Sequence, residues 1–288
     1  MVGFLILNLY SSVKNHKLYY FRDSNFSRKM EINRILHQMG GIDLSEMDSV
    51  SLLQRMDTKF VVPFASLEKM LLSVADKYRS LEINNQRLAT YETHYYDTED
   101  FALYKAHHNG KLNRYKIRHR EYVESDLSFL EVKFKNNKGK TIKTRINSSF
   151  NDEGFHTSEL EFIDSLMNHV PAKGLKKVLT NTFKRATLVS IENRERLTID
   201  TQLSFFHNNQ LIELPHLAII EVKNDKSSGN SEFLKLMREM HISPYSFSKY
   251  CTGVTMLYPD IKRNNFKVRL LFINKLRKYG LESTKSIR

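Results

Sequence analysis

Cysteine is nearly absent from this chain of 288 residues, which contains only Cys251. A single cysteine excludes an intrachain disulfide, and it excludes a metal cluster held by several thiolates. This usage is typical of a reducing compartment, so we expect a cytoplasmic protein in which Cys251 contributes to packing.

Long apolar runs are also missing. The opening segment, residues 1–10, is apolar but much shorter than the roughly 20 residues that a membrane-spanning helix needs. It has no charged n-region and no clear small-residue cleavage site, so we do not interpret it as a signal peptide. An alternative start of the chain is Met30 in place of Met1. A link to the inner face of a membrane would therefore require a separate membrane-protein partner.

Two common catalytic motifs are lacking as well. Gly139-Lys140-Thr141 resembles the end of a phosphate-binding P-loop, but the first glycine of that motif would stand at the position of Phe134. We therefore interpret this segment as a hairpin turn. No Gly-x-Ser-x-Gly nucleophile elbow occurs, so no catalytic nucleophile is evident.

Positive charge, in contrast, is abundant. The 45 Lys and Arg residues exceed the 32 Asp and Glu residues, which gives a net charge of +13 and a pI near 9.6. Such an excess attracts polyanions, among them nucleic acid, an anionic membrane, a nucleotide and polyphosphate. The composition, 41% hydrophobic and 27% charged, is that of a globular domain with tails. We expect an N-terminal extension at 1–45, one domain at 46–257 and a basic C-terminal tail at 258–288.

The hydrophobic periodicity predicts an α+β domain. Apolar residues at helical spacing predict amphipathic helices after Ser66, near Leu160 and near Phe233. Elsewhere the period changes to two, and turn sequences predict antiparallel hairpins. The predicted turns are 109–110, 137–139 and 207–209, and the predicted strands are 55–62, 87–97, 111–122, 127–136, 140–147, 177–192, 194–206 and 216–224.

Charged and apolar residues alternate along these strands, so each strand has one charged and one apolar face. An ordinary surface sheet shows the same alternation. Like charges side by side across strands repel one another, however, so this crowding favours a bound anion. With amphipathic helices over the apolar face, the charged face would line the basic, polar lumen of a closed or nearly closed antiparallel β-barrel tunnel. The charged residues of these faces are Arg114, Lys116, Arg118, Arg120, Glu131, Lys133, Lys135, Lys143, Arg145, Arg194, Arg196, Glu221 and Lys223.

Two glutamates stand in this basic field in the same local setting. Glu131 lies in Phe-Leu-Glu-Val-Lys, and Glu221 lies in Ile-Ile-Glu-Val-Lys. Each could form a buried ion pair with a neighbouring Lys or Arg. Each could instead hold Mg²⁺ or Mn²⁺, because hard cations are bound by one or two carboxylates together with substrate phosphates.

Eight short segments form an ordered set of motifs over residues 55–253. They are Thr58-Lys59-Phe60, His94-Tyr-Tyr-Asp97-Thr, Arg118-His-Arg120, Phe129-Leu-Glu-Val-Lys133, Lys143-Thr-Arg145, Glu195-Arg196-Leu-Thr-Ile-Asp200, Ile219-Ile-Glu221-Val-Lys223 and Ser246-Phe-Ser-Lys249-Tyr. Each motif is weak alone. Together and in this order they resemble the VTC domain of the vacuolar transporter chaperone polyphosphate polymerases. That family belongs to the triphosphate tunnel metalloenzymes, the CYTH-like superfamily, which implies strands closed into a tunnel with inward basic residues.

The resemblance implies a reaction in which the terminal phosphoryl group of ATP is added to a growing polyphosphate chain and ADP is released. It implies ATP and polyphosphate as partners and Mn²⁺ or Mg²⁺ as cofactor, with Glu221 as the metal ligand and Glu131 as a second candidate. Ser248 and Arg145 would assist in binding substrate. Such a site is physically reasonable, because phosphoryl transfer needs in-line positioning and neutralised oxygens more than covalent chemistry. The residues that would hold phosphates are Lys59, Arg118, Arg120, Lys133, Lys143, Arg185, Arg196 and Lys249.

The chain departs from the family pattern in several places. Phe183 stands where family members have a tyrosine, and Ser246 stands where they have a lysine. The SPX regulatory domain and the transmembrane helices of the vacuolar complex are not found in this sequence. The resemblance is therefore to a free-standing prokaryotic type of polymerase.

Two alternative functions belong to other classes. A tunnel-type triphosphatase would hydrolyse tripolyphosphate or a nucleoside triphosphate, and its family marker is Glu-x-Glu-x-Lys. Here the corresponding run, Arg55-Met-Asp57-Thr-Lys59, has the lysine but lacks the carboxylate pair. A nucleic-acid-binding protein would prefer exposed basic patches with stacking aromatic residues. The basic residues here alternate with core residues in the middle of strands, so we expect no nucleic-acid partner.

Overall fold

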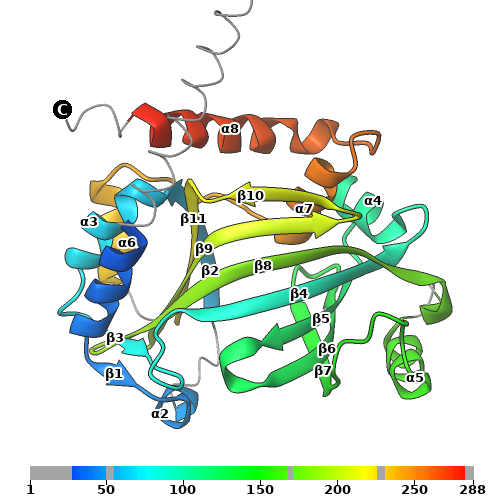
Figure 1. The fold of residues 1–288 in the computed structure, drawn as a ribbon, viewed down its shortest axis with the longest axis horizontal. Helices are drawn as coiled ribbons and strands as arrows, with labels where there is room; N and C mark the ends of the chain where they lie inside the picture. Colours follow the sequence, from blue (N-terminus) through cyan, green and yellow to red (C-terminus); the bar gives the residue numbers. More distant parts are fainter. Residues whose placement is uncertain (1–27, 50–54, 168–170, 226–230, 283–288) are drawn as a thin grey trace, which may run out of the picture.

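A large antiparallel sheet organises the molecule (Figure 1). The computed structural model describes residues 28–49, 55–167, 171–225 and 231–282. In these residues the main path of the sheet runs β2-β11-β9-β8-β4-β5-β6-β7, β10 pairs with β9, and β3 pairs with β8 and with β1. The strands are β1 (Gly41–Ile42), β2 (Arg55–Pro63), β3 (Tyr78–Leu81), β4 (Ala89–Thr98), β5 (Arg114–Tyr122), β6 (Leu127–Lys135), β7 (Thr141–Asn147), β8 (Leu175–Ser190), β9 (Glu195–His207), β10 (Gln210–Leu214) and β11 (Leu217–Asp225). The predicted α+β class is confirmed.

Alternation along the strands sorts side chains between the two faces of the sheet. In β6, Leu130 and Val132 belong to an apolar cluster beneath a helix, whereas Glu131 points the other way and meets Arg118 of β5. The register explains this contact, because Arg118 and Glu131 are direct cross-strand partners. In β5 and β6 the apolar face is therefore the outer face of the sheet, and the charged face is the inner one.

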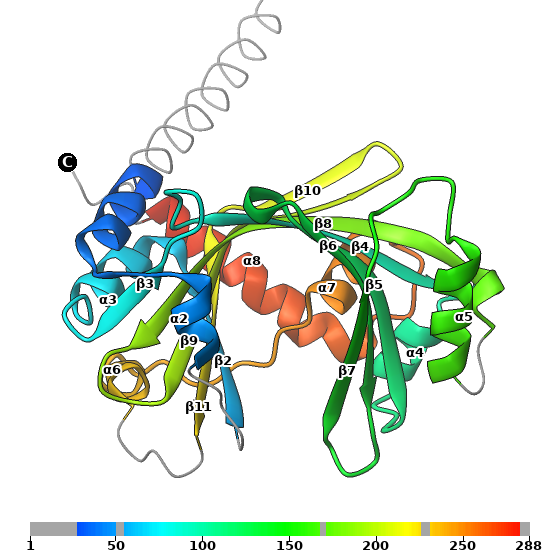
Figure 2. The same ribbon diagram turned by 90° about the horizontal axis from the view of Figure 1, so that it is seen from below.

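The sheet curls like a tunnel but does not close into a barrel. Figure 2 shows the end formed by β2 and β11 descending opposite the end formed by β5, β6 and β7. Within the described residues, β2 pairs only with β11, and β7 pairs only with β6. The expected tunnel is thus formed by an open, curled sheet and not by a closed barrel. The two edge strands of the sheet face each other across the concave side.

Helices cover the outer face at both ends of the sheet. At one end, residues 28–38, α3 (Leu67–Leu72) and α6 (Glu232–Glu239) pack Leu36, Met70 and Phe233 onto the outer side of β2, β9 and β11. At the other end, α5 (Thr157–Leu166) buries Ile163 against Ile117 and Leu130. The short helix α2 (Leu44–Ser49) follows β1. Among the described helices, none has both the length and the apolar character that crossing a bilayer requires.

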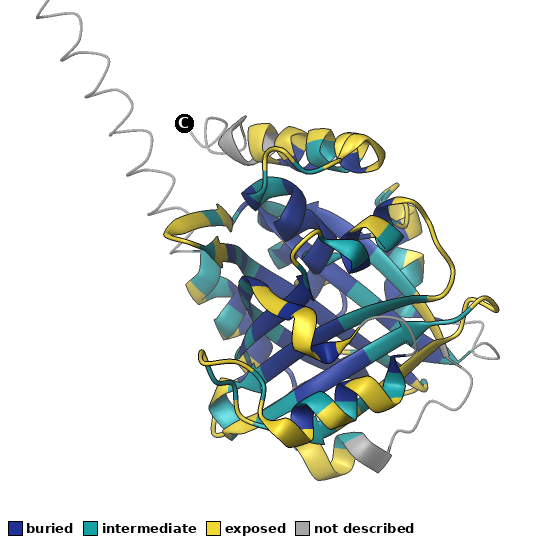
Figure 3. Cartoon of the chain, turned by 90° about the vertical axis from the view of Figure 1, so that its right-hand side faces the viewer, coloured by how far each residue is buried: buried dark blue, intermediate teal, exposed yellow. Residues whose placement is uncertain are grey.

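One helix lies inside the curl of the sheet rather than outside it. Figure 2 shows α7 (Lys249–Leu257) within the concave side, with α8 (Lys267–Glu282) behind it. The close approach of α7 to the sheet depends on Gly253, because a Cβ there would lie 2.6 Å from Phe205 and 2.9 Å from Leu179. Helix α4 (Ala102–His108) packs against α7. Figure 3 shows that α8 buries one side and exposes the other.

The predicted turns have different outcomes. The turn at 137–139 joins β6 to β7, and Asn208 and Asn209 join β9 to β10 with φ of 43° and 62°, as hairpins with left-handed turn residues do. The prediction at 109–110 was wrong. Asn109 and Gly110 end helix α4 before β5, and Gly110 has φ of 70°. A helix C-terminus and a hairpin turn both favour Asn-Gly because both need positive φ.

Candidate active site

Strands from both ends of the curled sheet, together with α7, bring the basic residues onto the concave face. The predicted cations are Lys59 on β2, Arg118 and Arg120 on β5, Lys133 on β6, Lys143 and Arg145 on β7, Arg185 on β8, Arg196 on β9 and Lys249 at the start of α7. Three carboxylates lie among them. Each carboxylate forms the centre of a small cluster of ion pairs.

Glu131 is the centre of the cluster on β5, β6 and β7. Arg118 donates from Nε and Nη2 to Glu131 Oε2 at 2.7 and 2.5 Å, and Lys143 Nζ donates to Oε1 at 3.2 Å. Burial alone would raise the pKa of Glu131, but Arg118, Arg120 and neighbouring lysines hold that pKa well below its usual range. The buried carboxylate is therefore ionised, and its contacts are those of the ion-pair alternative.

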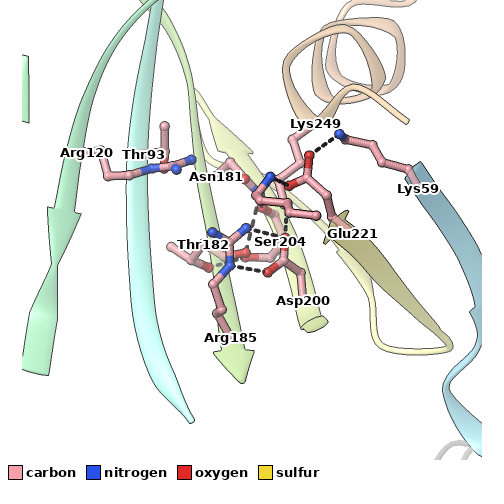
Figure 4. A network of polar contacts seen from close by, with 11 residues as sticks. Lys59, Thr93, Arg120, Asn181, Thr182, Arg185, Asp200, Ser204, Glu221 and Lys249 are labelled. Atoms are coloured by element: carbon pink, nitrogen blue, oxygen red, sulfur yellow. Dashed lines mark hydrogen bonds and ion pairs between the residues drawn. The ribbon is translucent and has the colours of Figure 1, made fainter. Parts of the chain in front are cut away.

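A second carboxylate, Asp200 on β9, was not assigned a role from the sequence. Figure 4 shows it between Arg185 and Lys249. Arg185 donates from Nε to Oδ1 at 2.6 Å and from Nη2 to Oδ2 at 2.8 Å, and Lys249 Nζ also contacts Oδ2. Burial raises the pKa of Asp200, but Arg185 and Lys249 outweigh it and bring the pKa to about 2. Alternation was the available signal, because Asp200 shares its strand face with Arg196.

Glu221 on β11 is the third carboxylate. Its Oε1 contacts Lys59, its direct cross-strand partner, and its Oε2 lies 2.7 Å from Lys223 Nζ. Burial would raise the pKa of Glu221, but Lys223 and Lys59 hold it well below its usual range. Lys223 also approaches Asp57, whose carboxylate is 3.6 Å away.

The carboxylates do not neutralise the cations around them. Arg120, whose exposed fraction is 7%, donates from Nε to the neutral hydroxyl of Thr93 at 3.2 Å. Arg118, burial and Arg120 together hold the pKa of Lys133 well below its usual value. Repulsion between like charges of this kind is relieved when an anion binds, so these two residues define the part of the lumen most receptive to phosphate.

Aromatic rings fill the space between the cations. The face of Phe183 lies 5.8 Å from the Arg120 guanidinium carbon, 5.2 Å from that of Arg185 and 4.2 Å from Lys249 Nζ. Tyr91 is 4.8 Å from Arg185. Cations near ring faces are attracted by the ring quadrupole, so Phe183 orders three cations without neutralising them.

The N-terminus of α7 also faces the lumen. Ser248 is the N-cap, and its hydroxyl accepts from the backbone N–H of Cys251 at 3.3 Å. Lys116 Nζ donates to the same hydroxyl at 3.3 Å. Tyr250 anchors the helix, since its hydroxyl contacts the buried carboxylate of Asp97.

A cavity of about 1250 Å³ adjoins these clusters. It lies between β2, the β6–β7 hairpin and the segment 244–248, and residues of α7 and α8 complete its lining. Lys59, Lys133, Ser246 and Ser248 line it, so it continues from the cluster on β2 to that on β6.

Two further predicted cations are cross-strand neighbours of cluster residues. Arg145 is exposed on β7, where its guanidinium lies over the ring of Phe129 at 4.2 Å. Arg196 lies at the far end of β9, in register with Lys223. Both lie on strands that form the lumen.

The fit of a divalent metal differs between the two predicted ligands. Both oxygens of each glutamate are bound by cations, so the two differ in exposure: the side chain of Glu131 is only 1% exposed. Glu221 is more accessible, with 18% of its side chain exposed, and it contacts Lys59, which lines the cavity. A metal at Glu221 would share the carboxylate with substrate phosphates, since one carboxylate and phosphate oxygens are a common Mg²⁺ ligand set.

Comparison with known proteins assigns the chain to a family. The VTC domain model matches residues 54–258. A solved structure from Bacillus halodurans, described as a candidate adenylate cyclase, has 16% identity and a TM-score of 0.47 over 71% of this chain and 97% of the other. HpAC1 from Hippeastrum, described with a dominant triphosphatase activity, has 13% identity and a TM-score of 0.43 over 70% and 96%. Comparison with curated proteins gives no match. Because the family model spans most of the chain, this protein belongs to the VTC domain family.

Proposed function

We propose that this protein is an ATP-dependent polyphosphate polymerase, which transfers the terminal phosphoryl group of ATP to a growing polyphosphate chain and releases ADP. The observation that carries the proposal is the surplus of cations on the concave face. Arg120 and Lys133 lie there with no carboxylate bound to them among the described residues, beside clusters that already contain Glu131 and Asp200. A polyanion supplies the missing negative charge.

The chemistry follows from this electrostatic arrangement. In phosphoryl transfer, charge spreads over the oxygens of the transferred group, and fixed cations stabilise it without covalent participation. Arg118, Arg120 and Lys133 would hold phosphates from the side of β5 and β6. Arg185 and Lys249 would hold them from the side of β8 and α7. The ion pairs with Glu131 and Asp200 fix the directions of these cations before substrate arrives.

We propose Glu221 as the residue that holds Mn²⁺ or Mg²⁺. A divalent ion bound there would neutralise phosphate oxygens beside the reacting group. Lys59 and Lys223 now satisfy the carboxylate, and both can turn to phosphate oxygens when the ion binds.

Extension of a polymer is supported over simple hydrolysis by two features. On β2, Arg55 stands at the position of the first carboxylate of the tunnel-triphosphatase marker and Asp57 at that of the second, so the carboxylate pair is incomplete. Asp57 lies near Lys223. The cavity of about 1250 Å³ adjoining the lumen, lined by several lysines and arginines, would also give a basic space for further phosphates. Binding of duplex nucleic acid is not supported, because Arg118 and Arg120 are each only 7% exposed.

We further propose a cytoplasmic site of action, where ATP is supplied, with residues 46–257 as the catalytic unit. Transport of the product across a membrane would then fall to a separate membrane protein. Association with that protein would be detected by co-purification from membranes with the tagged chain.

The test is incubation of purified protein with ATP and Mn²⁺, followed by a polyphosphate stain of the products on a gel. Polymer should form, and Lys133→Ala should reduce its rate on the order of 10²-fold, as loss of one preorganised electrostatic contact does. The exposed Lys173→Ala is the matched control and should retain full activity. Release of inorganic phosphate without polymer would instead identify a triphosphatase.

A further inference from the structure

The outer face of the sheet, on the side away from the lumen, contains a second group of polar residues. Glu92 and His94 lie on β4, and Glu121 lies on β5 directly opposite Glu92 in the register. One potential ligand atom from each of these side chains lies within 4.8 Å of the others. The group comes from neighbouring strands, so the sheet itself holds it together.

The two glutamates of this group repel each other. Like charges directly opposite each other on one face of a sheet are destabilising. Burial, followed by the charge of Glu92, raises the pKa of Glu121. Lys177, whose charge acts on His94, is bound to Asp152 and lies over the ring of Phe150. No cation of the described chain is therefore bound between the two carboxylates.

The imidazole of His94 is the observation that points to a ligand. His94 is 3% exposed, and its Nε2 is buried without a hydrogen-bond partner. Its Nδ1 is 3.0 Å from the hydroxyl of Thr180, and its ring stacks on Phe150 at 3.6 Å. In the tautomer in which Nδ1 donates to Thr180, Nε2 carries a lone pair beside the carboxylate of Glu92, so two acceptors lie next to each other.

The spacing of these acceptors fits a metal ion. His94 Nε2 and Glu92 Oε1 are 3.4 Å apart. Two ligands about 2.0–2.2 Å from a tetrahedral ion are separated by roughly 3.3–3.6 Å. Glu121 is partly exposed and can turn its carboxylate toward the same point. The hydrogen bond from Nδ1 to Thr180 is the kind of contact that orients a metal-bound histidine.

We propose that Glu92, His94 and Glu121 form a site for a divalent transition-metal ion, with Zn²⁺ as the ion that fits best. Imidazole nitrogen suits Zn²⁺, whereas Mg²⁺ prefers sites made of oxygen alone. Three protein ligands leave a fourth position for water. The ion ties β4 to β5 on the outer wall, directly behind Thr93 and Tyr95 of the lumen. This site is independent of the proposed polymerase activity.

The test is titration of metal-free protein with Zn²⁺, followed by calorimetry and by thermal unfolding. The wild type should bind Zn²⁺ at this site, and at a hundredfold excess over Kd its Tm should rise by about 5 °C or more. Glu121→Gln and Glu92→Gln should each abolish this binding and the rise in Tm. Glu221→Gln should retain both, because it alters only the lumen. Mg²⁺ should not reproduce the effect.

Glu99→Gln is the matched control, since Glu99 lies just beyond β4 with 85% of its side chain exposed. It should bind Zn²⁺ like the wild type. Metal-free Glu121→Gln should be at least as stable as the metal-free wild type, because it removes a repulsion, so loss of binding would not reflect unfolding. Equal Zn²⁺ binding by the wild type and Glu121→Gln, or no binding by the wild type, would overturn the proposal.

Discussion

At the residue scale, each buried carboxylate of the lumen organises two cations. Glu131 holds Arg118 and Lys143, and Asp200 holds Arg185 and Lys249. Side chains as long as lysine and arginine lose much conformational freedom when they are held in one orientation. The carboxylates bring that ordering about in the folded chain, so a phosphate meets cations that are already in place.

The Asp200 cluster predicts a dependence of stability on acid pH. The pKa of Asp200 falls from 3.8 to about 2 on folding. A carboxyl with a lowered pKa adds stability that is present above about pH 4 and is lost as the pH falls toward 2. Its contribution is about 2 kcal/mol. The free energy of unfolding should be measured with urea between pH 2 and 6. As the pH falls, it should decrease less in Asp200→Asn than in the wild type. An equal decrease in both proteins would contradict this role.

Substitution of Glu221 tests the metal assignment. Glu221→Gln should lower ATP turnover on the order of 10²-fold while the fold survives, and excess Mn²⁺ should restore part of the activity. Glu213→Gln, at an exposed position on β10, is the control. A purely structural ion pair predicts a different result, in which the Tm falls and Mn²⁺ has no effect on activity. Turnover across a Mn²⁺ titration and the Tm should therefore be measured on the same samples.

Most lumen residues could be predicted from the sequence, because alternation assigns a strand residue to a face. Glu131 and Lys133 show this directly. Leu130 and Val132, which alternate with them along β6, are buried on the other side of the sheet. The ionic partners could not be predicted in this way. Contact between Asp200 and Lys249 depends on where α7 lies, and no local pattern contains that information.

At the scale of elements, the eight strands of the main path were predicted within a few residues, but α7 was not predicted. The reason is its burial on all sides: Tyr250, Cys251, Val254 and Leu257 are all buried, together with the threonines between them. A helix enclosed in this way has no polar face, so the helical period is lost from its sequence. Strand β10 was missed because it is short and mostly exposed.

The packing of α7 predicts a strong effect at Gly253. In Gly253→Ala the new Cβ would lie 2.6 Å from Phe205 and 2.9 Å from Leu179, so the helix must move away from the sheet. Overpacking of this kind costs about 1–3 kcal/mol. Lys249 and Ser248 should move with the helix, so activity should fall as well. Stability should be measured by urea unfolding and activity by ATP turnover.

Gly174→Ala is the matched control for this change. A Cβ at Gly174 meets nothing within 4 Å. This variant should keep the stability and activity of the wild type. Equal stability of the Gly253 and Gly174 variants would contradict the close packing of α7.

At the scale of the whole molecule, the sequence could not predict whether the curled sheet closes into a barrel or stays open. Closure depends on whether β2 and β7, which are far apart in the sequence, come within hydrogen-bonding distance. That outcome follows from the summed twist of all strands and from α7 and α8 on the concave side. An open curl is compatible with the proposed polymerase activity, in which a polymer would advance by one phosphate at each turnover.

The net charge of +13 predicts that polyphosphate binding weakens as salt is added. Several Lys and Arg contacts act together, and the Debye length falls from about 10 Å at 0.1 M salt to about 3 Å at 1 M. Affinity should be measured by fluorescence anisotropy over this range. Binding that does not change with salt would rule out a basic lumen as the main source of affinity.

The most direct measurement is a crystal structure of the protein with tripolyphosphate. The phosphates should lie on the concave face, in contact with Arg118 and Lys133 on one side and with Arg185 and Lys249 on the other. Glu131 and Asp200 should keep their arginine partners, since those pairs orient the cations. Phosphates bound only to lysines on the outer surface, with the lumen ion pairs unchanged, would contradict the proposed active site.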